Sequence, residues 1–227
     1  MSKIVLHQWE ISPFCQKVSR MLRFKGLDFE TINYNGILGA KVPTLTKVGK
    51  VPVLDINGKR IQDSTRIARY LDETYPDLAK LYPIHPLEKV YAELWEDWAD
   101  ELLYFYEIHF RINDAKALAA AVKIASEGRP VHEAVIMKPL LKAGLNMQLK
   151  MQGLGRMSNE TIEQEFRLHL NRIALVLEQN DWLVGHQQSI ADIAVGSQLL
   201  EIIRTNDKFG AEILSHSSIA NWIERVK

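Results

Sequence analysis

The segment that most constrains the fold of this chain lies within its first third. Residues 51–56, VPVLDI, predict a short strand, and the Asn-Gly pair that follows predicts a hairpin turn. Residues 59–62, KRIQ, predict the partner strand, and a helix begins at Asp63-Ser64. Pro52 removes a backbone donor from the first strand, so this strand belongs at an edge or at a special turn. The segment therefore predicts a hairpin that leads directly into a helix.

The residues before this hairpin predict an earlier strand, helix and strand. Residues 3–8 are rich in β-branched and apolar side chains, which is typical of a buried strand. Ser12 can cap a helix whose first position is Pro13, and this helix ends at Gly26. Residues 28–33 alternate in character and predict a second strand. A loop with two glycines and a proline then leads to the hairpin.

The remainder of the chain has only helical patterns. Prolines mark residues 77–86 as a linker, which divides the chain into a first domain of residues 1–76 and a second of residues 87–227. After the linker, apolar residues recur at helical spacing in five segments: 87–112, 114–127, 131–151, 159–179 and 190–204. The sequence thus predicts strands and helices in the first domain and helices alone in the second.

The first of these helices carries a group of acidic residues beside Trp95 and Trp98. Four carboxylates lie there: Glu96, Asp97, Asp100 and Glu101. They suggest either a metal or acid pair, or a solvated helix face next to a buried face that includes Leu94 and the two tryptophans. We expect the solvated face. The seven histidines have no metal-ligand spacing, so we expect no metal site.

Composition excludes several classes of protein. The chain has 227 residues and a formal net charge of 0, which gives no electrostatic case for binding nucleic acid or an anionic membrane. Its single cysteine excludes an intramolecular disulfide and suits a reducing compartment. The first residues lack the apolar core of a signal peptide, and no apolar run is long enough to span a membrane. We therefore expect a cytoplasmic protein without nucleic-acid or membrane partners.

The SPFC segment at the start of the first helix is a candidate site for thiol chemistry. A helix N-terminus favours an anion such as a thiolate, and the Ser12 hydroxyl can donate a hydrogen bond to it. A hydrogen bond to a charged group contributes about 1.5–3 kcal/mol, which corresponds to roughly one to two pKa units of a thiol. Taken alone, Ser12 is more often a simple helix cap. Cys15 lies one helical turn further on and offers a thiol of the chain's own.

Two further features predict a site for a peptide-like ligand. The backbone of Val51 is left free beside Pro52 and can pair with an extended peptide. Exposed N–H groups at the helix start favour a carboxylate near Ser64, and Asp63 can accept an ammonium group. An α-amino acid end carries both charges side by side. The simpler interpretations are an edge-strand proline without a role and an ordinary helix cap.

These motifs occur in the order and at the spacing of a known family. The stretch LHQWEISPFCQKVSRMLRFKGLDFE resembles the N-terminal motif of serine-type, tau-like members of the cytosolic glutathione S-transferase superfamily. The stretch GKVPVLDINGKRIQDSTRIARYLDETYP resembles that family's cis-proline strand, hairpin and acidic residue-serine motif. In SIADIAV, Ser189 caps a helix and Asp192 reaches back to it, as in the capping box of the family's helical domain. The resemblance implies an α/β thioredoxin-like N-terminal domain followed by an all-α C-terminal domain.

The resemblance also implies a role for each candidate residue. Ser12 would hydrogen-bond the sulfur of glutathione, with Cys15 as the alternative. The backbone of Val51 would pair with the cysteinyl unit, just before a cis Pro52. The contacts to the two ends of the tripeptide would come from Asp63 and Ser64 at the γ-glutamyl end and from Lys50 at the glycyl carboxylate. The chain departs from the family pattern at LTKVGK, where an Asn-Pro pair is usual.

The implied reaction adds glutathione, as co-substrate, to an apolar electrophile, with no metal and no redox cofactor. The electrophile would lie between the first domain and the long helix, near four side chains for which core packing is the alternative role: Tyr104, Tyr106, His109 and Phe110. Family members are generally dimeric, so we expect a homodimer with a role in detoxification. Two other functions stay open, namely a Cys15-dependent thiol-disulfide or deglutathionylating enzyme and a non-catalytic binding or scaffold protein.

Overall fold

The computed structural model of the chain describes residues 3–226, and its first part is built on a four-stranded sheet. The strand order is β2-β1-β3-β4, with β1 parallel to β2 and antiparallel to β3, and with β3 antiparallel to β4. The strands are β1 Val5–Gln8, β2 Glu30–Asn33, β3 Val53–Ile56 and β4 Lys59–Gln62. Leu6 on β1 lies opposite Leu54 on β3, and both are fully buried. The predicted hairpin therefore forms half of the sheet.

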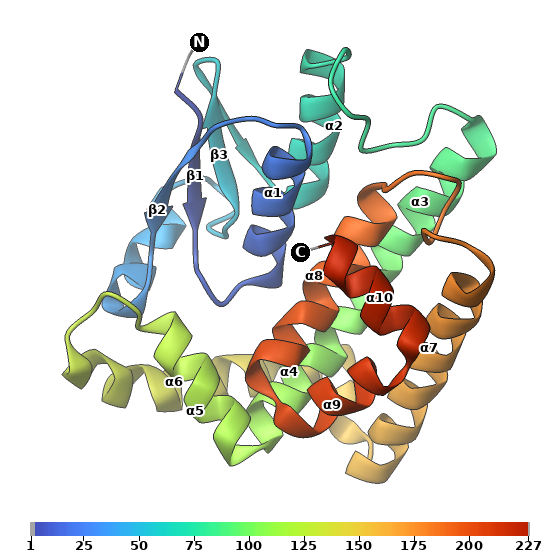
Figure 1. Cartoon of the computed structure of the whole chain (residues 1–227). Coiled ribbons are helices and arrows are strands. Elements are labelled where there is room, and N and C mark those ends of the chain that lie inside the picture. The colour runs from blue at the N-terminus through green and yellow to red at the C-terminus, as the bar shows by residue number, and fades with distance from the viewer. Residues whose placement is uncertain (1–2, 227) are drawn as a thin grey trace.

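Two helices of the first part, α1 Pro13–Phe24 and α2 Ser64–Thr74, contact each other beside the sheet. Their buried side chains recur at helical spacing and are Val18, Met21 and Leu22 on α1 and Ile67, Ala68 and Leu71 on α2. In Figure 1 both helices lie between the sheet and the remaining helices. The segment that we expected to be a loop contains a 3-10 helix, η1, at Gly36–Thr44.

The rest of the described chain is helical, as predicted, and Figure 1 shows its helices gathered on one side of the sheet. Its elements are α3 Pro86–Trp98, η2 Ala99–Leu103, α4 Tyr104–Asn113, α5 Ala115–Ala125, α6 Val131–Gln152, η3 Leu154–Arg156, α7 Asn159–Gln179, α8 Ile190–Thr205, α9 Asp207–Ser215 and α10 Ser217–Val226. The predicted fold class, a thioredoxin-like domain followed by an all-helical domain, is confirmed.

Helix α8 is the central element of the molecule, since almost all of its residues are buried and it contacts α1, α3, α4 and α9. The predicted capping box forms at its start. The Asp192 carboxylate accepts hydrogen bonds from Ser189 N at 2.9 Å and from Leu183 N at 2.9 Å. It also accepts one from Trp222 Nε1 on α10, again at 2.9 Å. One carboxylate thereby joins a helix start, the preceding loop and the last helix.

The long helix expected over residues 87–112 has a π-helical stretch, η2, between α3 and α4. The prediction of which face is buried is wrong for the first half of this helix. Leu94 is exposed and the two tryptophans are half-buried, whereas the buried positions are Ala92, Glu96, Ala99 and Leu103. The alanines allow α3 to approach α8 closely, so the large side chains are left on the outer side.

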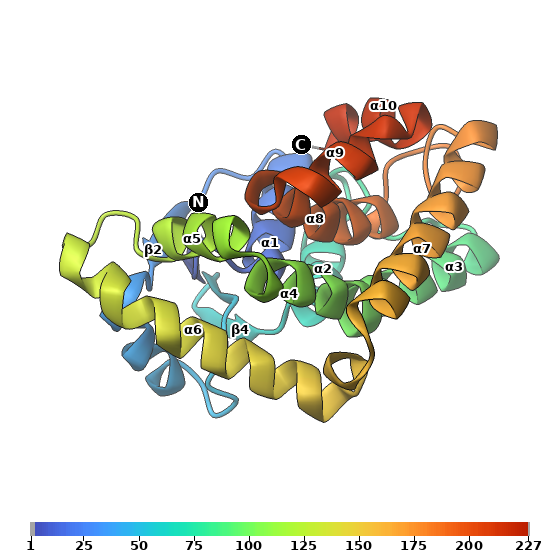
Figure 2. The same cartoon turned by 90° about the horizontal axis from the view of Figure 1, so that it is seen from below.

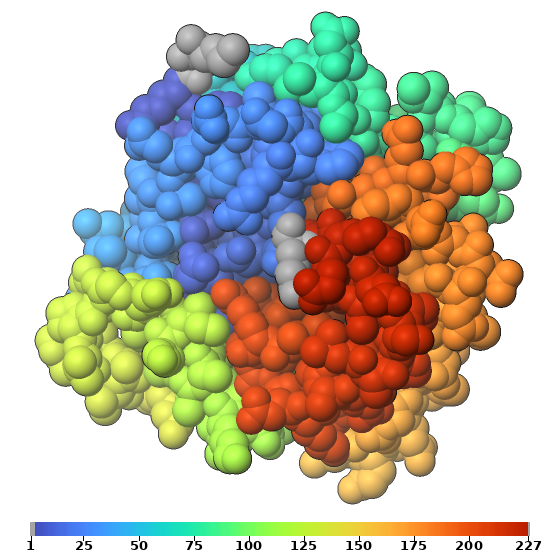
Figure 3. Space-filling view, viewed as in Figure 1, coloured from blue at the N-terminus to red at the C-terminus, as the bar shows by residue number. Residues whose placement is uncertain are grey.

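The two parts share one continuous apolar core that runs from the sheet through α8 to α10. Helix α2 ends at Thr74 and α3 begins at Pro86, which is the last residue of the predicted linker. The space-filling view shows the first part in direct contact with α5 and α6 below it and with the C-terminal helices beside it (Figure 3). Among residues 3–226, no helix combines the length and the apolarity needed to cross a bilayer.

Candidate active site

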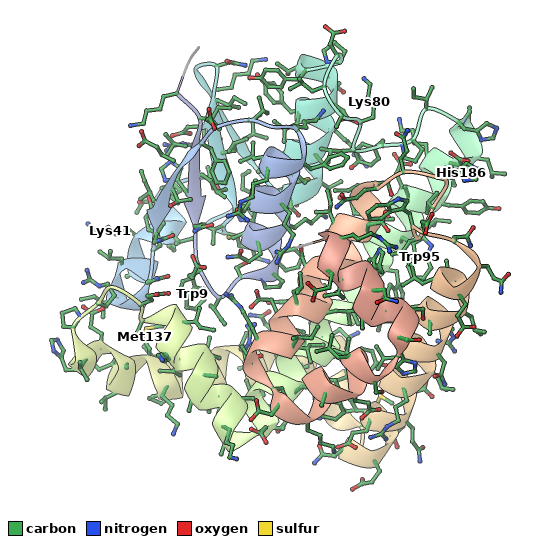
Figure 4. The ribbon with its side chains drawn as sticks, viewed as in Figure 1. Trp9, Lys41, Lys80, Trp95, Met137 and His186 are labelled. Atoms are coloured by element: carbon green, nitrogen blue, oxygen red, sulfur yellow. The ribbon has the colours of Figure 1, made fainter. Side chains whose placement is uncertain are left out.

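A cavity of about 770 Å³ lies between the first part of the molecule and the helices. Its walls come from the loop between β1 and α1, from η1 and the segment before β3, from η2 and α4, and from α6. Figure 4 labels two of its lining residues, Trp9 and Met137, and Lys41 lies on the same side of the molecule. Its polar and charged side chains are those of Ser12, Lys50, Asp100, Glu101, Arg111 and Gln148, together with the hydroxyl of Tyr104. The remaining lining is mostly apolar.

Ser12 is in the cavity wall at the N-terminus of α1. Its Oγ accepts a hydrogen bond from Cys15 N at 3.4 Å, and its side chain also hydrogen-bonds the Cys15 thiol, so the rotatable hydroxyl can donate to that sulfur or to an acceptor in the cavity. The partial positive charge of the helix start acts at the same point. Ser12 is therefore both a helix cap and a hydrogen-bond donor at the cavity surface.

Cys15 has a very different environment, although it is only three residues away. It is fully buried and is not part of the cavity wall. Its Sγ accepts a hydrogen bond from Trp9 N at 3.5 Å, and burial raises the pKa of the thiol to about 12. A thiol with such a pKa is neutral at physiological pH, so Cys15 lacks both the exposure and the ionisation of a reactive cysteine.

The predicted glutathione-binding residues fall into two groups. Lys50 and Val51 line the cavity, and the Val51–Pro52 peptide bond is cis. Asp63 and Ser64 do not line the cavity, but Asp63 N donates a hydrogen bond to Pro52 O at 3.4 Å. This bond places the start of α2 directly beside the cis-proline segment. Asp63 also caps α2, because its Oδ1 accepts a hydrogen bond from Arg66 N at 3.1 Å.

Of the four side chains expected near an electrophile, the structure brings only Tyr104 into the cavity wall. Tyr106 and Phe110 are buried and pack against Phe166 in the helical core. His109 is also buried and lies within 3.0 Å of Asn113 Nδ2 through its Nδ1 atom. Position on the long helix, rather than residue type, decides which of these side chains meets the cavity.

The acidic residues beside the tryptophans include two that the sequence prediction misplaced. Asp97 and Glu101 are exposed, as expected. Glu96 is only 1% exposed, and its side chain and that of Asp100 each accept a hydrogen bond from Lys17 Nζ at 2.7 Å. The prediction of a solvated face is therefore wrong for Glu96 and Asp100. Lys17 on α1 supplies a buried cation for these two carboxylates across the domain boundary.

Asp100 is the member of this group that reaches the cavity. Burial raises its pKa to about 6, Lys17 opposes this rise, and the nearby carboxylates of Glu96 and Asp63 add to it. Its Oδ1 has no hydrogen-bond partner among residues 3–226. The sequence offered one signal for this group, namely that Lys17 lies next to the apolar row of α1. It does not show which carboxylates Lys17 contacts.

A second charge cluster, buried at Arg111 and Glu201 and exposed at Arg204, holds the loop that precedes Ser12. Arg204 on α8 donates a hydrogen bond to Glu10 O at 2.7 Å, and Arg111 on α4 donates one to Ile11 O at 3.3 Å. Both arginines also contact the carboxylate of Glu201, at 2.9 Å and 3.4 Å respectively. Two successive carbonyls before the serine are thus held by two linked guanidinium groups from the helical domain.

In residues 3–226, no three His, Cys, Asp or Glu side chains are close enough together to hold a metal ion. The polar groups that line the cavity are two hydroxyls, an amide, a lysine, an arginine and two carboxylates.

Comparison with known proteins agrees with this arrangement. A family model described as glutathione S-transferase, N-terminal domain, matches residues 6–79, the part that holds Ser12, Val51 and Asp63. The first domain is therefore similar to the N-terminal domain of glutathione S-transferases. Glutathione S-transferase U8 of Arabidopsis thaliana is 34% identical over 94 residues, which are 40% of this chain and 42% of that relative. The probable glutathione S-transferase parA of Nicotiana tabacum is 32% identical over 107 residues, 45% of this chain and 48% of that relative.

The match to these curated relatives spans less than half of their length, whereas glutathione S-transferases of known structure share the fold of the whole chain. A Bombyx mori glutathione transferase has a TM-score of 0.68 at 21% identity, covering 100% of this chain and 88% of that chain. The β-etherase LigF of a Sphingobium strain has a TM-score of 0.71 at 20% identity, covering 99% and 95%. A Methylobacillus flagellatus glutathione S-transferase with glutathione bound has a TM-score of 0.62 at 21% identity, covering 98% and 94%.

Proposed function

We propose that this protein is a glutathione transferase that binds glutathione in the 770 Å³ cavity and joins its sulfur to an apolar electrophile. The observation that carries the proposal is the Ser12 hydroxyl, which lies at a helix N-terminus in the wall of an otherwise largely apolar cavity. A donor fixed at that point stabilises a thiolate better than the thiol, which is the requirement for activating glutathione.

The glutathione part of the cavity would extend from Ser12 along Val51 to the start of α2. The backbone of Val51 would pair with the cysteinyl unit, and Lys50 would meet the glycyl carboxylate. Asp63 and Ser64 would hold the γ-glutamyl end, with Asp63 accepting from its ammonium group. Asp100 would be a second acceptor for that ammonium group, because its Oδ1 has no hydrogen-bond partner among residues 3–226.

The electrophile would occupy the apolar side of the same cavity. Aromatic side chains line it where α1 and α4 meet, since the rings of Phe14 and Tyr104 lie with their centroids 4.8 Å apart. Leucines of α6 complete that wall. In the reaction the glutathione thiol loses its proton to solvent and Ser12 donates its hydrogen bond to the resulting sulfur anion. The sulfur electron pair then forms the bond to the electrophilic carbon, and any leaving group departs with its bonding electrons.

The test is a calorimetric titration with glutathione, followed by a conjugation assay with chlorodinitrobenzene. We expect Asp63→Asn to weaken glutathione binding about tenfold, because asparagine keeps the helix cap but removes the charge that meets the ammonium group. Asp77→Asn, at an exposed position of the linker, is the matched control and should bind normally. Absence of glutathione binding to the unmodified protein at millimolar concentration refutes the proposal.

We infer in addition that the protein is a homodimer that uses the outer face of α3. Leu87, Val90, Tyr91 and Leu94 are all exposed there, which is unusual for the surface of a monomer. Sedimentation velocity should give a dimer, and Leu94→Glu should give a monomer.

The single cysteine supports the expectation that the protein acts in the cytoplasm.

A further inference from the structure

Two segments beside the cavity mouth carry lysine and no acid. Residues 36–54 contain Lys41, Lys47 and Lys50 and have no aspartate or glutamate. Residues 134–159 contain three lysines and one arginine and likewise have no acidic residue. The whole chain, by contrast, has 28 basic and 28 acidic residues, so the charges are segregated. The carboxylates of the cavity wall, Asp100 and Glu101, come from η2 and belong to neither segment.

These two segments lie side by side, and we call their exposed surface the basic rim. Figure 2 shows α6 running along η1 on one face of the molecule. Ile37 N on η1 donates a hydrogen bond to Glu133 Oε2 on α6 at 2.9 Å. Glu133 is buried and also paired with Arg129, so it adds no free negative charge to the rim.

Helix α6 is fixed to the molecule along one narrow row only. Its buried residues are spaced by four: Glu133, Met137, Leu141, Leu145 and Leu149. Next to this row lies an exposed apolar stripe on one side of the helix: Ile136 at 49% exposure, Leu140 at 60%, Met147 at 61% and Met151 at 79%. Leu140 also lines the cavity, which places the stripe at the cavity mouth. Ile37 and Val48 are exposed on the other segment.

The exposed lysines of α6 lie on the flank opposite Ile136 and Leu140, because each lysine follows a residue of the buried row by one position. Lys138, Lys142 and Lys150 are all exposed and do not line the cavity. A helix that carries an apolar stripe together with lysines is suited to lie in the plane of a membrane surface. The apolar side chains enter the headgroup layer, and the lysines meet anionic headgroups.

We propose that the basic rim docks this protein onto an anionic lipid surface, with the cavity mouth facing the bilayer. The proposal goes beyond glutathione transfer, and it explains why a chain with no net charge concentrates acid-free segments at one opening. An apolar electrophile dissolved in the bilayer would then reach the cavity without crossing water. The partner is an anionic membrane because the outward side of α6, with Met147 and Met151, would enter the headgroup layer while the lysines on its flank meet anionic headgroups.

The experiment measures co-sedimentation of the full chain with vesicles. One set is phosphatidylcholine alone and the other is phosphatidylcholine and phosphatidylserine in equal parts. We expect binding to the second set only, and weaker binding as salt is added. Lys138→Glu, Lys142→Glu and Lys150→Glu combined should weaken this binding at least about tenfold, because each lysine near an anionic surface contributes about fivefold.

The matched control carries Lys59→Glu, Lys80→Glu and Lys89→Glu, which change the net charge by the same amount. Lys80 lies on the side of the molecule away from Lys41 (Figure 4), and none of the three belongs to the basic rim. The control should keep its vesicle binding. A second variant, Ile136→Ser with Met151→Ser, removes apolar contacts without changing charge and should also bind vesicles less.

Three results of the vesicle experiment overturn the proposal. The first is that the unmodified protein does not bind phosphatidylserine vesicles. The second is that the rim variant and the control lose binding equally. The third is that neither of them loses binding. Self-association through α6 in place of vesicle binding, seen by light scattering, also overturns it. Glutathione titration of the rim variant shows that it is folded, and that titration tests the proposed function independently.

Discussion

Ser12 and Cys15 are three residues apart and have opposite environments. Ser12 is in the cavity wall and has a hydroxyl proton to donate. Cys15 is fully buried, and burial raises its pKa to about 12. Ser12 is the N-cap in extended conformation just before α1, at the cavity, whereas Cys15 lies within the first turn of α1 and is covered by the core. The function of the SPFC segment therefore depends on which side chain reaches the cavity, and the structure shows that this is Ser12.

Replacement of Ser12 by alanine tests this reading. We expect Ser12→Ala to lower kcat/KM for conjugation about tenfold to a hundredfold, the kinetic equivalent of losing ~1.5–3 kcal/mol of hydrogen bonding to a sulfur anion. The pH-rate profile should shift upwards, because the bound thiol ionises less readily. Ser158→Ala is the control, since Ser158 caps α7 in the same way through Thr161 N but lies outside the cavity.

The same assay decides between the two candidate residues. Cys15→Ala should keep its pH-rate profile and lose stability only, because the substitution leaves a small hole in the core. Loss of activity in Cys15→Ala with full activity in Ser12→Ala contradicts the assignment.

At the scale of elements, the loop between β1 and α1 is held from outside its own domain. Arg204 on α8 and Arg111 on α4 donate to the carbonyls of Glu10 and Ile11, the two residues before Ser12. Glu201 joins the two guanidinium groups. The position of the serine thus depends on helices far along the chain, which explains why an isolated N-terminal motif is not sufficient to define the site.

We expect Arg204→Gln to lower kcat with a smaller change in KM for glutathione. The substitution removes a charged donor to Glu10 O and one partner of Glu201, so the loop before Ser12 is less well fixed, and about a tenfold loss is reasonable for one such bond. Steady-state kinetics measure the split. Arg225→Gln is the matched control, because Arg225 also donates to a backbone carbonyl, that of Asp181, away from the cavity. Equal losses in both variants would count against a positioning role.

At the scale of the whole molecule, buried charges lie at the junction between the two domains. Glu107 and Glu201 share the Arg111 guanidinium, and all three are almost fully buried. Burial raises the pKa of Glu107 to about 8, and Arg111 only partly offsets this rise. Glu201 is paired with Arg204 as well, whereas Glu107 has only the shared Arg111, so Glu107 is the carboxyl group that keeps its proton in the folded protein.

This protonation makes stability depend on pH. Between the ordinary value of 4.5 and about 8, Glu107 is ionised in the unfolded chain and protonated in the folded one. The unfolded state then binds fewer protons, so the free energy of unfolding falls as pH rises, by up to about 1.4 kcal/mol per pH unit. Denaturant titrations across this range should show a shallower fall for Glu107→Gln than for Glu178→Gln, an exposed control. A free energy of unfolding that rises over this range contradicts the prediction.

Several predictions from sequence agree with the structure because they depend on neighbours in the chain. The Asn-Gly hairpin, the caps at Ser12, Asp63 and Ser189, and the order of elements follow from local conformational preference and hydrogen bonding. The buried face of α3 was wrong for the opposite reason. Apolar side chains at helical spacing show that a helix has an apolar side, but α8 accepts the alanine side of α3 and leaves the tryptophans half-buried.

The sequence by itself determined the fold class and the three motifs proposed to meet glutathione, since short-range chemistry specifies them. Only the tertiary structure decided that Cys15 is closed off, that Lys17 meets Glu96 and Asp100, and that Tyr106 and Phe110 belong to the core. It also decided the distribution of charge. A net charge of 0 predicted no anionic membrane partner, but folding brings two acid-free segments together at one opening. Burial and electric field depend on which surfaces meet in space, and a sequence lists charges without placing them.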